Sequence, residues 1–174
     1  SGAQSIASAS WSSGTGPLSP DNWLITPLIS LSGGEELSFW AAAQDPAWPN
    51  EHYSVWLSTS GTDPGDFTVP LFEETLQNDT WHEVVIGLSD FSGETVHLAW
   101  RHHDVTDMFY MKIDDILVAN DTRGVEFSAD FESADDFAKF KTPRKEIFRG
   151  SSTGLSNVVF DLADGTNQSM FHGG

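Results

Sequence analysis

The feature of this sequence that most constrains its fold is a series of short apolar runs, broken by turn compositions about every ten residues. The clearest run, residues 52–58, reads HYSVWLS, and Tyr53, Val55 and Leu57 occupy every second position in it. Because successive side chains of a strand point to opposite faces, this alternation predicts a strand with one face in a core. Similar signals predict strands at 23–30, 36–43, 52–59, 67–75, 81–87, 95–102 and 108–118.

Turn-forming residues separate the predicted strands, as in GG at 33–34, GTDPG at 61–65 and DFSG at 90–93. Glycine supplies a positive φ, proline fixes φ, and Asp and Ser bond their own backbone. No helical period of comparable strength competes with these signals. The sequence therefore predicts an all-β fold, an antiparallel β-sandwich of the jelly-roll type.

The two ends of the chain differ in composition from the middle. Residues 1–20 are rich in Ser and Gly and allow either a mobile arm or a short edge strand through Ile6, Ala7 and Ala9. We expect residues 1–120 to form the main body of the sandwich and residues 121–174 to form a further segment, with a strand at 158–162. A basic cluster in that segment marks a polyanion site or a solvated surface that relieves an acidic body: Lys139, Lys141, Arg144, Lys145 and Arg149.

The charge and composition of the chain exclude several classes of partner. A net charge of −18 excludes nucleic acid, because a phosphate backbone would be repelled. The same charge suits either divalent cations or a well-solvated surface. No run approaches the ~18 apolar residues of a membrane span. With 0 Cys, the chain has no disulfides, no thiolate zinc site and no cysteine nucleophile.

Several phrases in the middle of the chain carry a resemblance to a known family. They read DNWLITP at 21–27, LSFWAAAQD at 37–45, EHY at 51–53, and RH at 101–102, followed by TDMF at 106–109 and IDDI at 113–116. On these residues, the chain resembles the cleaved-adhesin domains of gingipain-type proteases and of related haemagglutinins. The resemblance implies a jelly-roll sandwich with bound calcium, carried on secreted or surface-associated proteins. It also implies adhesion to host proteins, blood cells or haem-containing proteins.

The order of the segments departs from that family. A family domain opens with a Phe-Glu segment before its Ser/Ala-rich strand, whereas here the Ser/Ala-rich residues 5–11 come first and DFES follows at 130–133. Circular permutation, excision from a tandem array and the start of a second repeat are the three explanations. We expect residues 125–174 to complete the sandwich built by 1–120, in cis or by exchange with a neighbouring copy or repeat.

Calcium is the chemistry that the acidic residues suggest most strongly, because the ion takes six to eight oxygen ligands. Asp114 and Asp115 are consecutive on the last strand of the main body, so their side chains are expected on opposite faces. One carboxylate would then enter the sandwich, where an unpaired charge is costly. The resemblance implies that Glu132 joins Asp114 or Asp115 at a structural calcium ion. The alternative is an Asp pair satisfied by backbone donors and by Arg101 or Lys112.

The loop at residues 45–51 is a second candidate metal site, with Asp45 and Glu51 as ligands and Asp104 or Asp107 as further ones. The alternative is that Asp45 closes an Asx turn and that Glu51 is exposed to solvent.

The histidines raise the question of zinc or haem, through His52, His102, His103 and His172. Because neighbouring residues of a strand face opposite ways, His102 and His103 cannot both bind one ion without a bulge. We expect each histidine to be hydrogen bonded or at the surface, and we keep His52 as a candidate ligand-binding residue.

The tryptophans fall into two groups. Trp23, Trp40 and Trp100 lie in strongly apolar runs and are predicted to be core. The others can stack on sugar rings or anchor core and loops: Trp11, Trp48, Trp56 and Trp81. Of these, Trp48 and Trp56 are the candidate ligand-binding residues.

No local pattern fixes a catalytic nucleophile, because the Gly-x-Ser-x-Gly elbow is missing from the sequence. The sequence therefore predicts a non-catalytic, calcium-stabilised adhesin domain of a secreted or cell-surface protein, with a host or matrix protein as its partner. A carbohydrate-binding module of a larger extracellular hydrolase is the alternative. A structural domain that holds a protease complex together is the third possibility.

Overall fold

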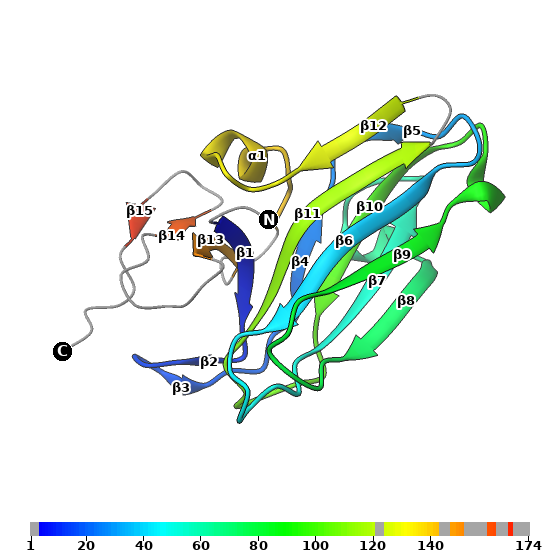
Figure 1. The fold of residues 1–174 in the computed structure, drawn as a ribbon. Coiled ribbons are helices and arrows are strands. Elements are labelled where there is room, and N and C mark those ends of the chain that lie inside the picture. Colours follow the sequence, from blue (N-terminus) through cyan, green and yellow to red (C-terminus); the bar gives the residue numbers. More distant parts are fainter. Residues whose placement is uncertain (1–3, 121–123, 143–146, 152–159, 163–166, 169–174) are drawn as a thin grey trace.

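The computed structural model describes residues 4–120, 124–142, 147–151, 160–162 and 167–168. These residues form two antiparallel β-sheets packed face to face, with a small two-stranded ribbon at one end (Figure 1). The strands are β1 (Gln4–Ala9), β2 (Trp11–Ser12), β3 (Gly16–Pro17), β4 (Asn22–Ile25), β5 (Ile29–Ser30), β6 (Glu36–Ala43), β7 (His52–Ser58), β8 (Val69–Thr75), β9 (His82–Gly87), β10 (Thr95–His102), β11 (Tyr110–Asn120), β12 (Gly124–Ala129), β13 (Ile147–Ser151), β14 (Phe160–Leu162) and β15 (Asn167–Gln168). The helical elements are the short helix α1 (Ala134–Ala138) and the 3₁₀ turns η1 (Pro64–Asp66) and η2 (Ser89–Phe91).

The larger sheet has the order β15-β14-β13-β1-β11-β6-β9, and β12 also pairs with β11. The smaller sheet has the order β4-β10-β7-β8, with β5 paired to β10. From β6 to β11 the chain passes repeatedly between the two sheets, as in a jelly roll. The predicted fold class, an antiparallel β-sandwich of the jelly-roll type, is confirmed.

The main core fills the space between the two sheets. Tyr53, Val55 and Leu57 are fully buried in it, as the alternation of that strand predicts. Phe39 from the larger sheet meets Tyr53 and Trp100 from the smaller sheet edge to face, with ring centroids 6.2 and 5.4 Å apart. Such pairs add about 0.5–1.5 kcal/mol each to the burial of apolar area. These contacts fix the position of one sheet relative to the other.

The predicted strands match the observed ones closely, with one exception in the first of them. The predicted strand at 23–30 is divided into β4, which ends at Ile25, and β5, which begins at Ile29. Pro27 lies between them, and a proline has no N–H for the ladder. Helix α1 was not predicted, although Ser133 caps it by accepting a hydrogen bond from the Asp136 N–H at 3.3 Å.

Strand β1 lies inside the larger sheet, so both alternatives for this stretch, a mobile arm and a short edge strand, are wrong. It pairs with β11 on one side and with β13 on the other (Figure 1). Ile6, Ala7 and Ala9 are all buried. The small and apolar residues of this stretch suit a buried strand that has a neighbouring strand on each side.

Part of the C-terminal segment packs against the main body within this chain. Strand β12 pairs with β11, and β13 pairs with β1. The backbones of Ile25 and Lys141 exchange hydrogen bonds of 2.9 and 2.8 Å. Four phenylalanines of this segment are buried in the main core: Phe127, Phe131, Phe137 and Phe140.

Some predictions fall outside the described residues. These include Arg144 and Lys145 of the basic cluster, His172, and the first two residues of the strand predicted at 158–162. Among the described helices, none has the length and apolar character needed to cross a membrane.

Candidate functional site

The clearest acidic site lies where β11 changes neighbours. Strand β1 pairs with β11 up to Ile113, and β12 pairs with it from Ile116 onward. Asp114 and Asp115 occupy the gap, where the pairing with β6 shifts register and Asp115 has φ of 49°. Ile113 and Ile116 both enter the core, a spacing of three positions that a bulge produces.

This bulge corrects the prediction that the two carboxylates face opposite ways. Asp114 lies opposite Trp40 in the neighbouring strand, and Trp40 is exposed. Asp115 lines a groove together with Trp40. Because the extra residue shifts the alternation, both Asp side chains lie on the outer face of the larger sheet.

Glu132 reaches the same junction from the end of β12. Its Oε1 accepts a hydrogen bond of 2.9 Å from the Gln4 N–H at the start of β1. Asp114 as a residue is 5% exposed, and its Oδ1 accepts a 2.8 Å hydrogen bond from the Asp115 N–H. Burial raises the pKa of Asp114 to about 7, and the negative charges of Asp115 and Glu132 act in the same direction. The structure therefore places the three residues expected at calcium at one junction, although their carboxylates are not among the described groups whose ligand atoms all lie within 4.8 Å of one another.

The two cations named as alternative partners of the Asp pair have contacts elsewhere. Arg101 Nε donates a 2.7 Å hydrogen bond to Asp21 Oδ1. The Lys112 ammonium lies 5.0 Å from the centre of the Trp81 ring, and burial lowers the pKa of this lysine.

A groove of about 490 Å³ runs beside this junction between β6, β9, β11, β12 and α1. Trp40 is 37% exposed in its wall, so the prediction of Trp40 as core is wrong. Leu37, Phe39 and Ala41 take the core face of β6, and alternation turns Trp40 outward. The groove also contains four carboxylates: Glu83, Asp115, Asp130 and Asp136. Asp136 is paired with Lys139 of the same chain, and the excess of carboxylates over this one ammonium group is complementary to further cationic groups.

Asp45 and Glu51, the second pair of predicted metal ligands, have different partners. Asp45 Oδ1 accepts a 2.8 Å hydrogen bond from the Ala47 N–H, which is an Asx turn. Glu51 is completely buried, so the alternative of an exposed Glu51 is wrong. Its Oε1 accepts bonds of 2.8 Å from Ser10 Oγ and from the Phe109 N–H.

Glu51 belongs to a buried polar network that joins the two sheets. Its Oε2 lies 2.8 Å from His102 Nε2, and His102 Nδ1 lies 2.7 Å from Ser8 Oγ. Asn22 Nδ2 donates a 3.0 Å bond to the same Ser8 hydroxyl. A serine, a histidine and a carboxylate in series resemble a nucleophilic triad. However, the cavity beside Ser8 measures only about 20 Å³, which is room for one water molecule rather than a substrate.

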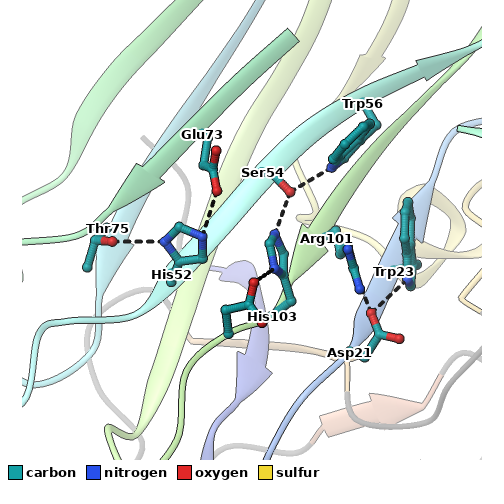
Figure 2. A network of polar contacts seen from close by, with 10 residues as sticks. Asp21, Trp23, His52, Ser54, Trp56, Glu73, Thr75, Arg101 and His103 are labelled. Carbon is teal, nitrogen blue, oxygen red and sulfur yellow. Dashed lines mark hydrogen bonds and ion pairs between the residues drawn. The ribbon is translucent and has the colours of Figure 1, made fainter. Parts of the chain in front are cut away.

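His103 lies beside Ser54 (Figure 2), which alternates with the core residues Tyr53 and Val55. His103 is therefore on the outer face of the smaller sheet, opposite to His102, as strand alternation predicts for neighbouring histidines. Its Nε2 lies 2.7 Å from Ser54 Oγ, and its Nδ1 lies 2.8 Å from Asp104 Oδ2. Trp56 Nε1 donates a 2.6 Å hydrogen bond to the same Ser54 hydroxyl.

His52 lies beside His103 on that face (Figure 2). Its Nδ1 is 2.8 Å from Thr75 Oγ1, and its Nε2 is 3.1 Å from Glu73 Oε1. The two imidazole rings meet edge to face, with centroids 4.9 Å apart. Asp104 was expected as a further ligand beside Asp45 and Glu51, whereas its carboxylate contacts His103. The role of Glu73 was not predicted, because it depends on which residues of β7 and β8 lie opposite one another.

The two tryptophans chosen as ligand-binding residues lie in different surroundings. Trp48, in the loop after β6, is 51% exposed. Trp56 is half-buried and packs against a separate apolar cluster on the outer face of the smaller sheet, formed by Trp23, Ile25, Phe67 and Ala99. Trp48 therefore offers a free ring surface, and Trp56 offers part of one.

Comparisons with known proteins agree with the fold and with the resemblance in the sequence. A family model described as Cleaved Adhesin Domain matches residues 1–118. Gingipain R1 of Porphyromonas gingivalis is 36% identical over 135 residues, which cover 70% of this chain and 8% of that relative. Hemagglutinin A of the same organism is 37% identical over 134 residues, covering 66% of this chain and 5% of the relative.

Solved structures of two cleaved adhesin domains of Lys-gingipain from the same species share the fold. The K1 domain has a TM-score of 0.62 and 36% identity, covering 67% of this chain and 74% of the K1 chain. The K3 domain has a TM-score of 0.61 and 37% identity, covering 66% of this chain and 70% of the K3 chain. The relatives include proteases, but the matching unit in these structures is an adhesin domain. The chain therefore belongs to the cleaved-adhesin family, as a non-catalytic adhesin domain.

Proposed function

We propose that this domain is a calcium-stabilised binding domain of a secreted or cell-surface protein, and that it attaches that protein to a host or matrix protein. The observation that carries the calcium part is the buried Asp114 carboxyl, which lies near two further carboxylates at the junction of β1, β11 and β12.

The residues of this junction suit calcium for an electrostatic reason. Asp114, Asp115 and Glu132 are hard oxygen donors, the type of ligand that Ca²⁺ prefers. The burial of Asp114 and the nearby charges of Asp115 and Glu132 disfavour the ionised form of the Asp114 carboxyl. A bound cation would remove this penalty and would tie the start of β1 to the end of β12. Calcium in this role supplies stability rather than chemistry.

The attachment part rests on the family and on the surface of the larger sheet. The name of the relative Hemagglutinin A denotes agglutination of red blood cells, which supports a role in attachment for this chain. The groove with Trp40 and its carboxylates is suited to Lys or Arg side chains of a partner, through ion pairs and cation–π contact. A protein partner with basic segments fits this surface best.

A glycan is the second candidate ligand, because Trp48 presents an exposed ring on a loop. Aromatic rings bind the apolar faces of sugar rings by stacking. Such a ligand would use a different surface from the acidic groove.

The experiment that tests attachment is binding to surfaces coated with matrix and plasma proteins, before and after enzymatic deglycosylation. We expect binding to survive deglycosylation, to fall at least about tenfold in Trp40→Ala, and to persist in Trp48→Ala. Leu28→Ala is the matched control, because Leu28 is an exposed apolar residue in the connection between β4 and β5 of the smaller sheet. Loss of binding on deglycosylation together with loss in Trp48→Ala would replace the protein partner with a glycan.

A further inference from the structure

The pairing of β7 with β10 brings two histidines from distant parts of the sequence to one point. The last cross-strand pair is Tyr53 with His102, and the next backbone contact is a 3.2 Å hydrogen bond from the His103 N–H to the His52 carbonyl oxygen. Both imidazoles therefore lie on the outer face of the smaller sheet (Figure 2). Asp104 follows at once with φ of 52°, and this turn brings its carboxylate to His103.

These three residues form a convergent set of ligand atoms. One atom from each of His52, His103 and Asp104 lies within 4.8 Å of the others. Among the described parts of the chain, this is the one group of three His, Asp or Glu residues that converges so closely. The carboxylate of Glu73, held by His52 Nε2, is a fourth group beside them.

Each imidazole has a hydroxyl on one nitrogen and a carboxylate on the other. For His52 these partners are Thr75 and Glu73. For His103 they are Ser54 and Asp104. A hydroxyl can donate or accept, so it satisfies either tautomer of the ring. The proton of a neutral ring can therefore sit on the nitrogen that faces the hydroxyl, which leaves the lone pair of the nitrogen that faces the carboxylate for a metal ion. Outer hydrogen bonds of this kind orient histidine ligands in metal sites.

We propose that His52, His103 and Asp104 bind a divalent transition-metal ion of the Zn²⁺ type, with Glu73 or water as the fourth ligand. This site goes beyond the proposed adhesin function and is separate from the carboxylates at Asp114. Two imidazoles and a carboxylate, with one further position, are a usual zinc donor set. Two nitrogen ligands disfavour Ca²⁺, which prefers oxygen.

The burial of the ligands differs in a way that suits closure around an ion. The side chain of His103 is only 8% exposed, whereas those of Asp104 and Glu73 are 82% and 66% exposed. The buried ring therefore provides a fixed point, and the carboxylates can move inward to metal–ligand distances of about 2.0–2.2 Å. Burial lowers the pKa of His103, which keeps its imidazole neutral at pH 7 and able to donate an electron pair.

The test is a calorimetric titration of the intact, metal-free chain with Zn²⁺ in millimolar Ca²⁺, which occupies general carboxylate sites. We expect one Zn²⁺ per chain, with affinity at least about tenfold weaker in His52→Gln and in His103→Gln. Binding should weaken in acid, because a protonated imidazole cannot bind a metal ion. Co²⁺ in place of Zn²⁺ should give the visible absorption of a low-symmetry nitrogen–oxygen site.

His82→Gln is the matched control, because His82 is also paired with a glutamate, at 3.1 Å, but has no second histidine in this set. Its Zn²⁺ binding should equal that of the parent chain. Should His103→Gln fail to fold, His52→Gln and the exposed Asp104→Asn decide the question. No Zn²⁺ binding in excess Ca²⁺, or binding that both of these variants leave unchanged, would overturn the proposal.

Discussion

Replacing Asp114 with asparagine should stabilise the calcium-free protein above neutral pH. The folded state holds the proton of Asp114 up to a pKa of about 7, whereas the ordinary pKa of an Asp carboxyl is 3.8. Between these pH values, unfolding releases a proton, so a rise in pH favours the unfolded state. The parent chain therefore loses stability from about pH 4 to pH 7, and the loss levels off above that.

The difference between these two pKa values corresponds to roughly 4 kcal/mol, at about 1.36 kcal/mol for each pH unit. Between pH 5 and pH 8, only the part of that interval from pH 5 to pH 7 contributes, and it lowers the free energy of unfolding of the parent chain by about 3 kcal/mol. The asparagine side chain of the Asp114→Asn variant would keep an oxygen acceptor for the Asp115 N–H and has no charge to bury. The stability of Asp114→Asn relative to the parent should thus rise by about 3 kcal/mol over this range.

The assay is urea unfolding of both proteins in EDTA at pH 5 and at pH 8. At each pH the stability of the parent is subtracted from that of Asp114→Asn, which cancels the contributions of titrating groups far from the site. Asp90→Asn is the control, since it removes one exposed carboxylate without changing the junction. An equal difference between parent and Asp114→Asn at both pH values would refute the reasoning, because the buried carboxyl would then not titrate with folding.

Three further predictions concern stability and can be checked by the same urea titrations. The free energy of unfolding of Glu51→Ala should be about 3–5 kcal/mol lower than that of the parent, because His102 and two other donors lose a buried partner. A loss below about 1 kcal/mol would contradict the structural role given to this network. Phe131→Ala should also lose about 3–5 kcal/mol, since Phe131 is fully buried in the main core; unchanged stability would mean that residues 124–142 fold separately. Trp48→Ala should change stability by less than about 0.5 kcal/mol, and Trp56→Ala by clearly more, because only Trp56 packs on neighbouring rings; equal effects would count against this difference.

The sequence could predict the fold because each strand carries its own signal. Alternation at residues 52–58 and the turn compositions depend on local sequence alone, and the observed strands match them. The exceptions have local causes that were visible in principle. Pro27 divides the first predicted strand, and Ser133 is a typical N-cap residue three positions before Asp136, whose N–H donates to the Ser133 side chain at the start of helix α1.

The candidate sites were harder to predict because they depend on which residues of different strands lie opposite one another. Asp114 and Asp115 share a face only because of a bulge, and a strict alternation of two cannot foresee it. His102 and His103 were correctly placed on opposite faces. The neighbour of His103 is His52, about fifty positions away, and only the pairing of β7 with β10 shows this.

The measurement that tests the central claim most directly is thermal unfolding of the EDTA-treated chain as calcium is titrated back. A ligand that binds only the folded state, at about 100 times its dissociation constant, adds roughly 2.7 kcal/mol. For a domain of this size, we expect a rise in Tm of several degrees, lost in Asp114→Asn and not reproduced by Mg²⁺ at the same concentration. If Tm did not rise in a sample verified to be metal-free, the account would be contradicted. The carboxylates at the junction would then destabilise the folded state without forming a calcium site.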